Sequence, residues 1–324
     1  MKIKIYFLVI PCFLLSNQFD NFKKNENQII SILTENDAYF EPFIKSDKYY
    51  TAGHYISYVS SEYENIFLNK IALLSYLYDN NYSRFNITLN QEIYTPASKY
   101  TIPPPKNDAL YGAAFFVTFG VINRTRNLME QISLDIGFVG PWALGKQIQN
   151  GIHKITNNRS SLGWDYQIKN EFLLNLNYGL IYRWTFIEDF FDILPQANIF
   201  LGNSYTAISA GARMRIGYGI KNDFGIQKYK SKISQIIVED GLKIYALVGI
   251  NGSIVGRNIF IEGNTFGGVK SNLKLNRFLY EYELGLMIGY KYISLSYLYT
   301  RSSKAFKTQN DLHSYGSIRL EISF

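Results

Sequence analysis

Apolar and polar residues alternate along much of the chain, which is the pattern of β-strands whose two faces meet different surroundings. The clearest example is the C-terminal segment 312–324. Ile318, Leu320, Ile322 and Phe324 share one face of this segment, and polar residues occupy the positions between them. In a membrane barrel the apolar face would meet lipid and the polar face the lumen. An outward aromatic residue at the C-terminus resembles the signal read by the outer-membrane barrel assembly machinery, so this machinery is an expected partner.

Twelve segments of this kind are expected. They lie near 27–38, 50–61, 83–95, 110–122, 130–140, 166–185, 190–202, 205–219, 240–254, 279–290, 292–302 and 312–324. An even number of strands places both termini in the periplasm, so odd-numbered strands run outward. Outer loops are then expected near 40–49, 96–109, 141–165, 203–204, 255–278 and 303–311. The chain reads as a single domain, because no linker, repeat array or low-complexity tract interrupts it.

Two of the expected connections could contain a helix. The periplasmic link 62–82 could form a short amphipathic helix on the inner leaflet, or it could continue as extended strands. The outer loop 141–165 contains a stretch from Gly145 to Lys154 that could form two helical turns, weakened by Gly151. The expected fold is therefore an all-β, transmembrane antiparallel β-barrel with a short helix in an outer loop.

The composition agrees with a membrane barrel. Aromatic residues make up 16% of the chain, with 27 tyrosines, and tyrosines stand at the ends of many apolar faces, where barrels have aromatic girdles. A soluble periplasmic β-sandwich would also alternate but would rarely place tyrosines in this way. The net charge of +7 would suit the phosphates of lipid head groups, and nothing resembles a nucleic-acid-binding patch.

Residues 1–17 read as a secretory signal peptide. A basic start, Met1–Lys4, precedes the apolar run Ile5–Leu15, which is too short to span a bilayer. Cys12 is the single cysteine and would be removed with the signal. The mature domain, 18–324, would then form the barrel without disulfides or thiol chemistry.

Oxygen-bearing side chains gather where the first two expected strands meet. Asn36 and Asp37 end the first strand, and Thr51 and Gly53 begin the second. One short loop would bring them together, and such hard oxygen ligands suit calcium better than zinc. Because adjacent strand residues point to opposite faces, Asn36 and Asp37 can serve one site only if the strand bulges or ends there. A simple turn-forming role is the alternative explanation for this pair.

His153 is the histidine best placed for chemistry. On a helix in the loop 141–165, Gln149 and His153 would lie one turn apart on the same face. This arrangement can hold a base beside an amide that orients the base or a water. His54 is expected to meet lipid or head groups, and His313 is expected to point into the lumen. Each histidine also has a purely structural interpretation.

The expected topology brings the polar motifs to one rim. The first strand ends there at Asn36–Asp37, the second begins there at Thr51, the third ends there at Glu92–Pro96, and His153 lies in an outer loop. Other catalytic patterns are missing from the sequence, including G-x-S-x-G, a phosphate-binding glycine loop and H-E-x-x-H.

Taken in order, these motifs resemble those of the outer-membrane lipid A 3'-O-deacylase family over nearly the whole mature chain. The resemblance is densest at Glu35–Asp37, Tyr50–Gly53, Gln91–Pro96, Gly137–Pro141, Gln149–His153, Trp164 and Gln167.

The resemblance implies a twelve-stranded barrel with a calcium-dependent site at its outer rim. It implies that His153 is the general base and that Asp37 binds or positions calcium. It also implies that Asn36 and Thr51 complete the site and that Gln149 supports it.

A family lysine follows the Tyr-x-Pro segment, and Lys99 is the candidate here. Lys106 is its rival, because the loop length differs. Two segments depart from the family pattern. Asp108–Gly112 lacks the usual arginine and proline, and Arg159 and Ser161 fall where an acid and a tyrosine can occur. These departures affect secondary substrate contacts.

The expected function is calcium-dependent hydrolysis of the ester-linked 3' acyl or acyloxyacyl chains of lipid A, in the lipopolysaccharide of the outer leaflet. The expected location is the bacterial outer membrane, where lipopolysaccharide and membrane lipids are the partners. A non-enzymatic small porin or adhesin is one alternative, and an outer-membrane phospholipase is another.

Overall fold

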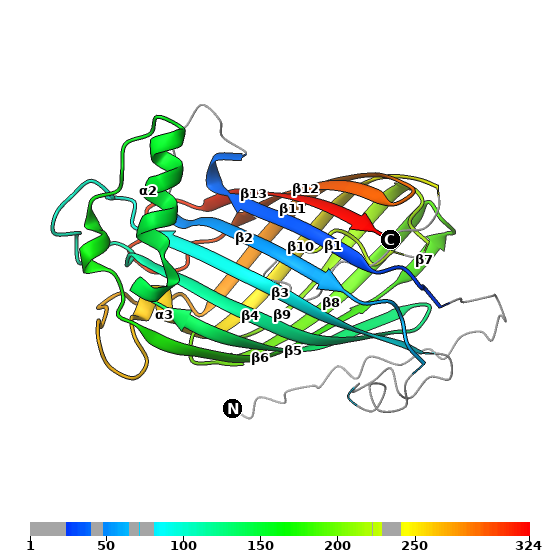
Figure 1. The fold of residues 1–324 in the computed structure, drawn as a ribbon, viewed down its shortest axis with the longest axis horizontal. Helices are drawn as coiled ribbons and strands as arrows, with labels where there is room; N and C mark the ends of the chain where they lie inside the picture. Colours follow the sequence, from blue (N-terminus) through cyan, green and yellow to red (C-terminus); the bar gives the residue numbers. More distant parts are fainter. Residues whose placement is uncertain (1–23, 40–47, 65–70, 72–80, 222, 229–240) are drawn as a thin grey trace, which may run out of the picture.

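The chain forms a closed antiparallel β-barrel with a helix against its outer wall (Figure 1). The structure is a computed structural model that describes residues 24–39, 48–64, 71, 81–221, 223–228 and 241–324. The expected signal peptide and most of the link 62–82, for which a short helix and extended strands were both possible, lie outside the described residues.

The barrel consists of twelve long strands and one short extra strand. In chain order the strands are β1 (Ile29–Asn36), β2 (Tyr49–Val59), β3 (Tyr82–Thr95), β4 (Gly112–Arg124), β5 (Leu128–Val139), β6 (Glu171–Tyr182), β7 (Trp184–Ile187), β8 (Phe191–Gly202), β9 (Tyr205–Tyr218), β10 (Leu242–Asn258), β11 (Phe278–Tyr290), β12 (Ile293–Ser302) and β13 (His313–Ser323). The twelve long strands pair in chain order, with β6 pairing directly with β8, and β1 pairs with β13, which closes the sheet. The short β7 is added to the end of β8. The prediction of an antiparallel barrel of about twelve strands is confirmed.

All the described helices lie at one end of the barrel. They are the 3-10 helices η1 (Asp37–Tyr39), η3 (Pro141–Ala143) and η4 (Gly163–Tyr166) and the α-helices α2 (Gly145–Ile155) and α3 (Ile259–Glu262). We call this end, on the left of Figure 1, the outer end, following the orientation predicted for the termini. Among the described residues, no helix has the length and apolar character needed to cross a membrane.

Three boundaries differ from the sequence prediction. β6 begins at Glu171 rather than near 166, because residues 163–166 form η4. β10 continues to Asn258 rather than 254, through a register shift between Val255 and Arg257 that interrupts the alternation. The predicted helix in the loop 141–165 is confirmed, but α2 has about three turns instead of two.

The outer face of the barrel is apolar. On β11, for example, Leu284, Leu286 and Ile288 are each more than half exposed, and their side chains alternate with buried ones. An apolar outer band of this kind matches the hydrocarbon core of a bilayer.

The inner face is polar, and ion pairs fill the lumen at the periplasmic end. Arg215 lies between Asp192 and Asp223, with nitrogen–oxygen distances of 2.6 and 2.7 Å. Arg213 pairs with Glu283 at 2.7 Å. Charges this deeply buried are tolerated because each has an opposite charge in contact with it. This part of the lumen is therefore a packed polar interior.

Barrel closure gives the C-terminus a structural role. The backbone groups of Gln28 and Phe324 exchange two hydrogen bonds, of 2.9 and 3.0 Å, beyond the last residues of β1 and β13. The Phe324 side chain is 58% exposed on the outer face. Deleting Phe324 is expected to lower the yield of folded barrel in outer-membrane fractions, because unpaired backbone groups are costly in lipid. Gel heat-modifiability measures this yield, and activity per folded molecule should stay normal. An unchanged yield would show that this closing contact is dispensable.

Candidate active site on the outer wall

Near the outer end, the lipid-facing sides of β1, β2 and β3 change from apolar to polar. The polar residues on this face are Thr34, Asn36, His54, Gln91 and Thr95. Thr34 pairs with His54 across the strands, and His54 pairs with Gln91, so these three form one row. The Thr34 hydroxyl lies 3.1 Å from His54 Nδ1. A polar row on a wall that faces acyl chains is costly unless other groups engage it, which makes this surface the candidate site.

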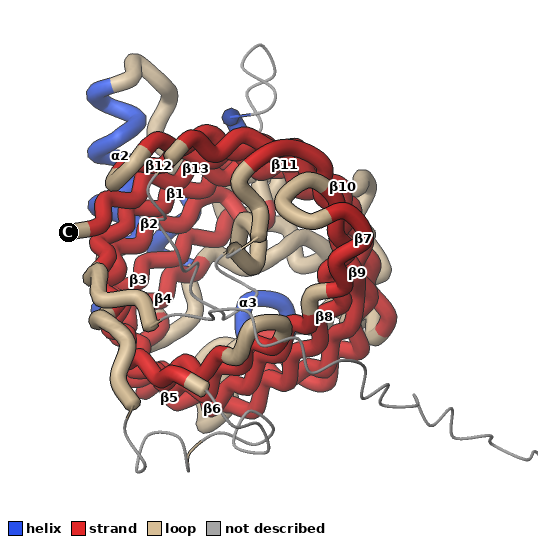
Figure 2. Tube along the Cα trace, turned by 90° about the vertical axis from the view of Figure 1, so that its right-hand side faces the viewer, coloured by secondary structure: helices blue, strands red, loops and turns tan. Residues whose placement is uncertain are grey.

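Helix α2 covers part of this surface from the lipid side. Figure 2 shows α2 outside the ring of strands, whereas α3 lies within its outline. The Gln91 side-chain nitrogen donates a hydrogen bond of 2.6 Å to the Ala143 carbonyl, which anchors the start of the connection. Ala52, Ile93 and Ala113 then pack with Ala143 and Trp164 in one buried cluster. The site is therefore a layer between the barrel wall and this connection.

Small residues set how closely α2 approaches the wall. A Cβ atom placed on Gly145 would lie 2.5 Å from the Ala113 Cβ and 2.7 Å from the Trp164 ring. Both distances are far below van der Waals contact. Gly151, in the same helix, would have nothing within 4 Å of its Cβ.

This difference gives a matched pair of variants. Gly145→Ala is expected to push α2 away from β4 and to reduce activity at least about 10-fold, because a displacement of about 1 Å at an active site can cost more than that. Gly151→Ala is expected to retain activity and to stabilise the helix by about 0.5–1 kcal/mol. Activity per heat-modifiable barrel is the measurement. Equal activities in the two variants would show that activity does not require close packing of α2 on the barrel wall.

Gln149 and His153 are the candidate functional side chains that α2 positions. Both are buried, at 3% and 7% exposure, as their shared face predicts. Gln149 Oε1 accepts a hydrogen bond of 2.9 Å from the Trp164 indole. His153 Nδ1 lies 2.8 Å from the Arg159 carbonyl oxygen. A carbonyl can only accept, so Nδ1 carries the proton and Nε2 is the basic nitrogen.

Thr51 reaches the outer face through a β-bulge. The pairing of β2 with β3 shifts between Tyr50 and Ala52, so Thr51 is the extra residue. Its hydroxyl lies 2.7 Å from that of Thr95, and both residues are almost fully buried. A bulge re-aims a side chain in this way. Thr95 is a site residue that the sequence interpretation did not single out.

Asn36 and Asp37 stand where β1 ends, and Asp37 is the first residue of η1. Adjacent residues within a strand would point to opposite faces, but the strand ends here, so Asn36 and Asp37 can both serve one site. The Asn36 side-chain oxygen accepts from the Ala38 backbone at 2.7 Å, and one Asp37 oxygen accepts from the Lys48 backbone at 2.8 Å. Asp37 is 2% exposed.

The register connects this strand end to the helix-covered surface. Asn36 pairs with Ala52, Ala52 with Ile93, and Ile93 with Ala113. Asn36 therefore lies in the same cross-strand row as Ala52, Ile93 and Ala113, the residues on which the α2 connection packs.

The two candidate lysines differ in their surroundings. Lys99 is 7% exposed, and its carbonyl accepts from the Tyr111 hydroxyl at 2.7 Å and from the Leu162 backbone at 3.0 Å. These bonds tie the β3–β4 loop to the α2 connection. Lys106 is exposed in the same loop. The structure thus places Lys99, and not Lys106, against the segment that carries His153.

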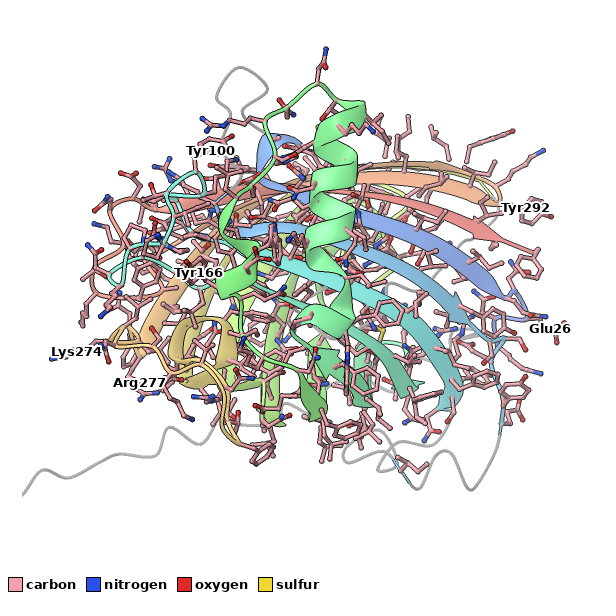
Figure 3. All side chains as sticks on the ribbon, turned by 60° about the vertical axis from the view of Figure 1, so that its left-hand side comes forward. Glu26, Tyr100, Tyr166, Lys274, Arg277 and Tyr292 are labelled. Carbon is pink, nitrogen blue, oxygen red and sulfur yellow. The ribbon has the colours of Figure 1, made fainter. Side chains whose placement is uncertain are left out.

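Two cationic side chains, those of Lys99 and Arg159, lie beside the Tyr100 ring, and we call this group the cationic border. The Lys99 ammonium lies 5.5 Å from the Tyr100 ring centre, and the Arg159 guanidinium lies 4.4 Å from it. Figure 3 shows Tyr100 and Tyr166 at the outer end, beside the connection that carries α2. This border suits an anionic group such as a phosphate.

The donor set of the site fits calcium. Asp37 supplies one carboxylate, and Asn36, Thr51 and Thr95 supply neutral oxygens. Calcium accepts such oxygens together with backbone carbonyls and water. Within the described residues, no group of three or more His, Cys, Asp or Glu side chains is arranged to hold a metal ion.

The closed barrel, its apolar outer face and the polar site on that face define the class of protein. It is a β-barrel of the bacterial outer membrane whose candidate site lies on the outer wall, beneath α2. The family model described as "Outer membrane protein LpxR" matches residues 5–324, so the chain belongs to the LpxR family. The resemblance to outer-membrane lipid A deacylases seen in the sequence is thereby confirmed.

Two solved structures are compared with this chain, and the fold agreement rests on the first of them. LpxR from Salmonella typhimurium superposes with a TM-score of 0.72 at 20% identity, over 91% of this chain and 100% of that chain. The β domain of the Bordetella autotransporter BrkA gives a TM-score of 0.46 at 10% identity, over 93% of this chain and 100% of that chain. A comparison with curated protein sequences found no match.

Proposed function

We propose that this protein is a calcium-dependent lipid A 3'-O-deacylase. Its reaction is the hydrolysis of the ester that links the 3' acyl or acyloxyacyl chain to lipid A in the outer leaflet. The observation that carries the proposal is the position of His153. It is a buried histidine with a defined tautomer, on a helix packed against the lipid-facing wall.

His153 acts as the general base. With its Nδ1 proton donated to the Arg159 carbonyl, Nε2 can take the proton of a water molecule that attacks the ester carbonyl. A backbone carbonyl cannot turn away as a side chain can, so this bond fixes the ring. Gln149, one turn earlier, is held by the Trp164 indole and positions the water or the substrate.

Asn36, Thr51 and Asp37, at the ends of β1 and β2, complete the proposed site. Asp37 would hold calcium with help from the oxygens of Asn36 and Thr51. When bound, calcium supplies positive charge that stabilises the oxyanion of the transition state. Lys99 contributes a cation at the border of the site for an anionic group of the substrate.

Mass spectrometry of lipid A tests this function. Expression of the gene in a host that lacks the activity should give lipid A whose mass is lower by the 3' acyl or acyloxyacyl substituent. Unchanged lipid A would instead favour a porin or adhesin. Unchanged lipid A with accumulated lysophospholipids would favour a phospholipase.

A further inference from the structure

A cavity lies inside the barrel, on the other side of the wall from the candidate active site. It is bounded toward the outer end by α3 and by residues of the β12–β13 loop such as Phe306. Its volume is about 120 Å³, which is room for about eight water molecules and is comparable to one sugar ring. A second hollow of about 60 Å³ shares Tyr94, Phe200 and Phe260 with it.

Two adjacent rows of the barrel wall give this cavity a neutral polar side. One row consists of Gln196, Gly211 and Asn251, and the next consists of Asn198, Ser209 and Ser253. All but Gly211 line the cavity. Because Gly211 has no side chain, the Asn251 amide can lie over it: a Cβ atom at Gly211 would be only 2.8 Å from Asn251 Oδ1.

Three carbonyl oxygens in these rows lack partners. Gln196 Oε1, Asn198 Oδ1 and Asn251 Oδ1 are buried and accept no hydrogen bond from any described residue. The residues themselves are only 7%, 3% and 6% exposed. The amide nitrogens of Asn198 and Asn251 reach the hydroxyls of Ser209 and Ser253, at 3.2 and 3.5 Å, so the oxygen ends are the available ones. Buried polar atoms are normally bonded, so three such acceptors in one cavity point to a ligand that donates hydrogen bonds.

Aromatic rings supply the rest of the lining. Tyr94 and Phe260 are stacked with their ring centres 3.8 Å apart, and Phe200 and Tyr205 meet edge to face at 5.5 Å. Apolar ring faces beside a few placed polar groups are typical of small-ligand sites.

The charged residues at the cavity neutralise one another. Lys228 pairs with Glu281, and it also lies 2.7 Å from Glu283, which pairs with Arg213. An ionised ligand would therefore gain little from the charges around the cavity.

We infer that this cavity binds a neutral sugar residue. Its hydroxyl groups donate to the carbonyl oxygens of Gln196, Asn198 and Asn251, and its C–H face packs on the aromatic rings. The sugar comes either from a free saccharide or from the glycan of a membrane lipid. Because the cavity and the catalytic site lie on opposite faces of the wall, the inference stands apart from the proposed deacylase activity.

Binding to the full-length barrel in an amine-oxide detergent, which carries no sugar, tests the inference. The probes are glucose, galactose, N-acetylglucosamine and maltose, with glucosamine and glucuronate as charged counterparts, and binding is measured by saturation-transfer NMR and calorimetry. We expect at least one neutral probe to bind and both charged probes to bind more weakly. The variant Asn198→Leu/Asn251→Leu keeps the side-chain shape but loses two acceptors, so affinity should fall at least about 10-fold.

Asn86→Leu is the matched control, because Asn86 is a buried lumen amide that bonds to Gln131 and does not line the cavity. It should bind the sugar as the wild type does, and heat-modifiability checks that all variants fold. Competition by lipopolysaccharide with neutral core sugars, but not by lipid A, would assign the site to a membrane glycan. Competition by neither would assign it to free saccharides. Absence of binding by every neutral probe, or equal binding by the double variant, would overturn the inference.

Discussion

Replacement of His153 by alanine is expected to reduce lipid A deacylation at least about 100-fold while leaving a folded, heat-modifiable barrel. The expected size of the loss is typical of removing a general base. The barrel should survive, because α2 lies outside the ring of paired strands and Gln149, Trp164 and Gly145 still dock it on the wall. Lipid A mass spectrometry, normalised to folded protein, measures the effect.

Two control variants separate catalysis from packing. Lys154→Ala changes the next residue of α2, which is exposed, and should leave activity near normal. His54→Ala removes the histidine of the wall that bonds to Thr34, and should lower activity far less than loss of the base does. Near-normal activity of His153→Ala would remove His153 from the mechanism.

Removal of calcium by a chelator is expected to abolish activity, and readdition of calcium should restore it. Magnesium should restore it poorly, because it requires a tight octahedral shell and gives up its waters reluctantly. Asp37→Asn should raise the calcium concentration needed for half-maximal activity at least about 10-fold, since the site loses its charged ligand. A calcium titration of deacylation in wild type and variant measures the shift.

Asp165→Asn is the matched control for this change. Asp165 also lies at the outer end, but it is exposed and pairs with Lys146 at 2.7 Å. Its loss should leave the calcium requirement unchanged. Full activity in excess chelator would refute the metal proposal, and the same titration curve for Asp37→Asn as for wild type would exclude Asp37 as a ligand.

The barrel itself could be predicted from alternation, because inward and outward positions of each strand face such different surroundings. Errors arose where the period breaks. The alternation predicts a strand from about 166, but residues 163–166 form η4, in which the Trp164 indole donates a hydrogen bond to Gln149. The end of β10 was missed because a register shift after Val255 interrupts the pattern.

The candidate site was predictable in its residue types and less so in its arrangement. The helical face shared by Gln149 and His153 and the strand end at Asn36 follow from short-range spacing. The bulge that turns Thr51 toward Thr95 depends on how β2 meets β3, which local spacing does not encode. The close approach of Gly145 to Ala113 joins residues far apart in sequence and becomes visible only in the packed structure.

His153 and its partners lie between α2 and the lipid-facing wall of the barrel, which has a consequence for how substrate arrives and how other amphiphiles inhibit the reaction. A substrate held in the leaflet arrives by sliding sideways along the membrane, so the encounter is two-dimensional, and the relevant concentration is the mole fraction of lipid A among its neighbours. Detergent that dilutes lipid A in mixed micelles should slow the reaction even when the total concentration of lipid A in the sample is unchanged. Any neighbouring amphiphile should also inhibit, because it competes with lipid A for the same part of the barrel wall.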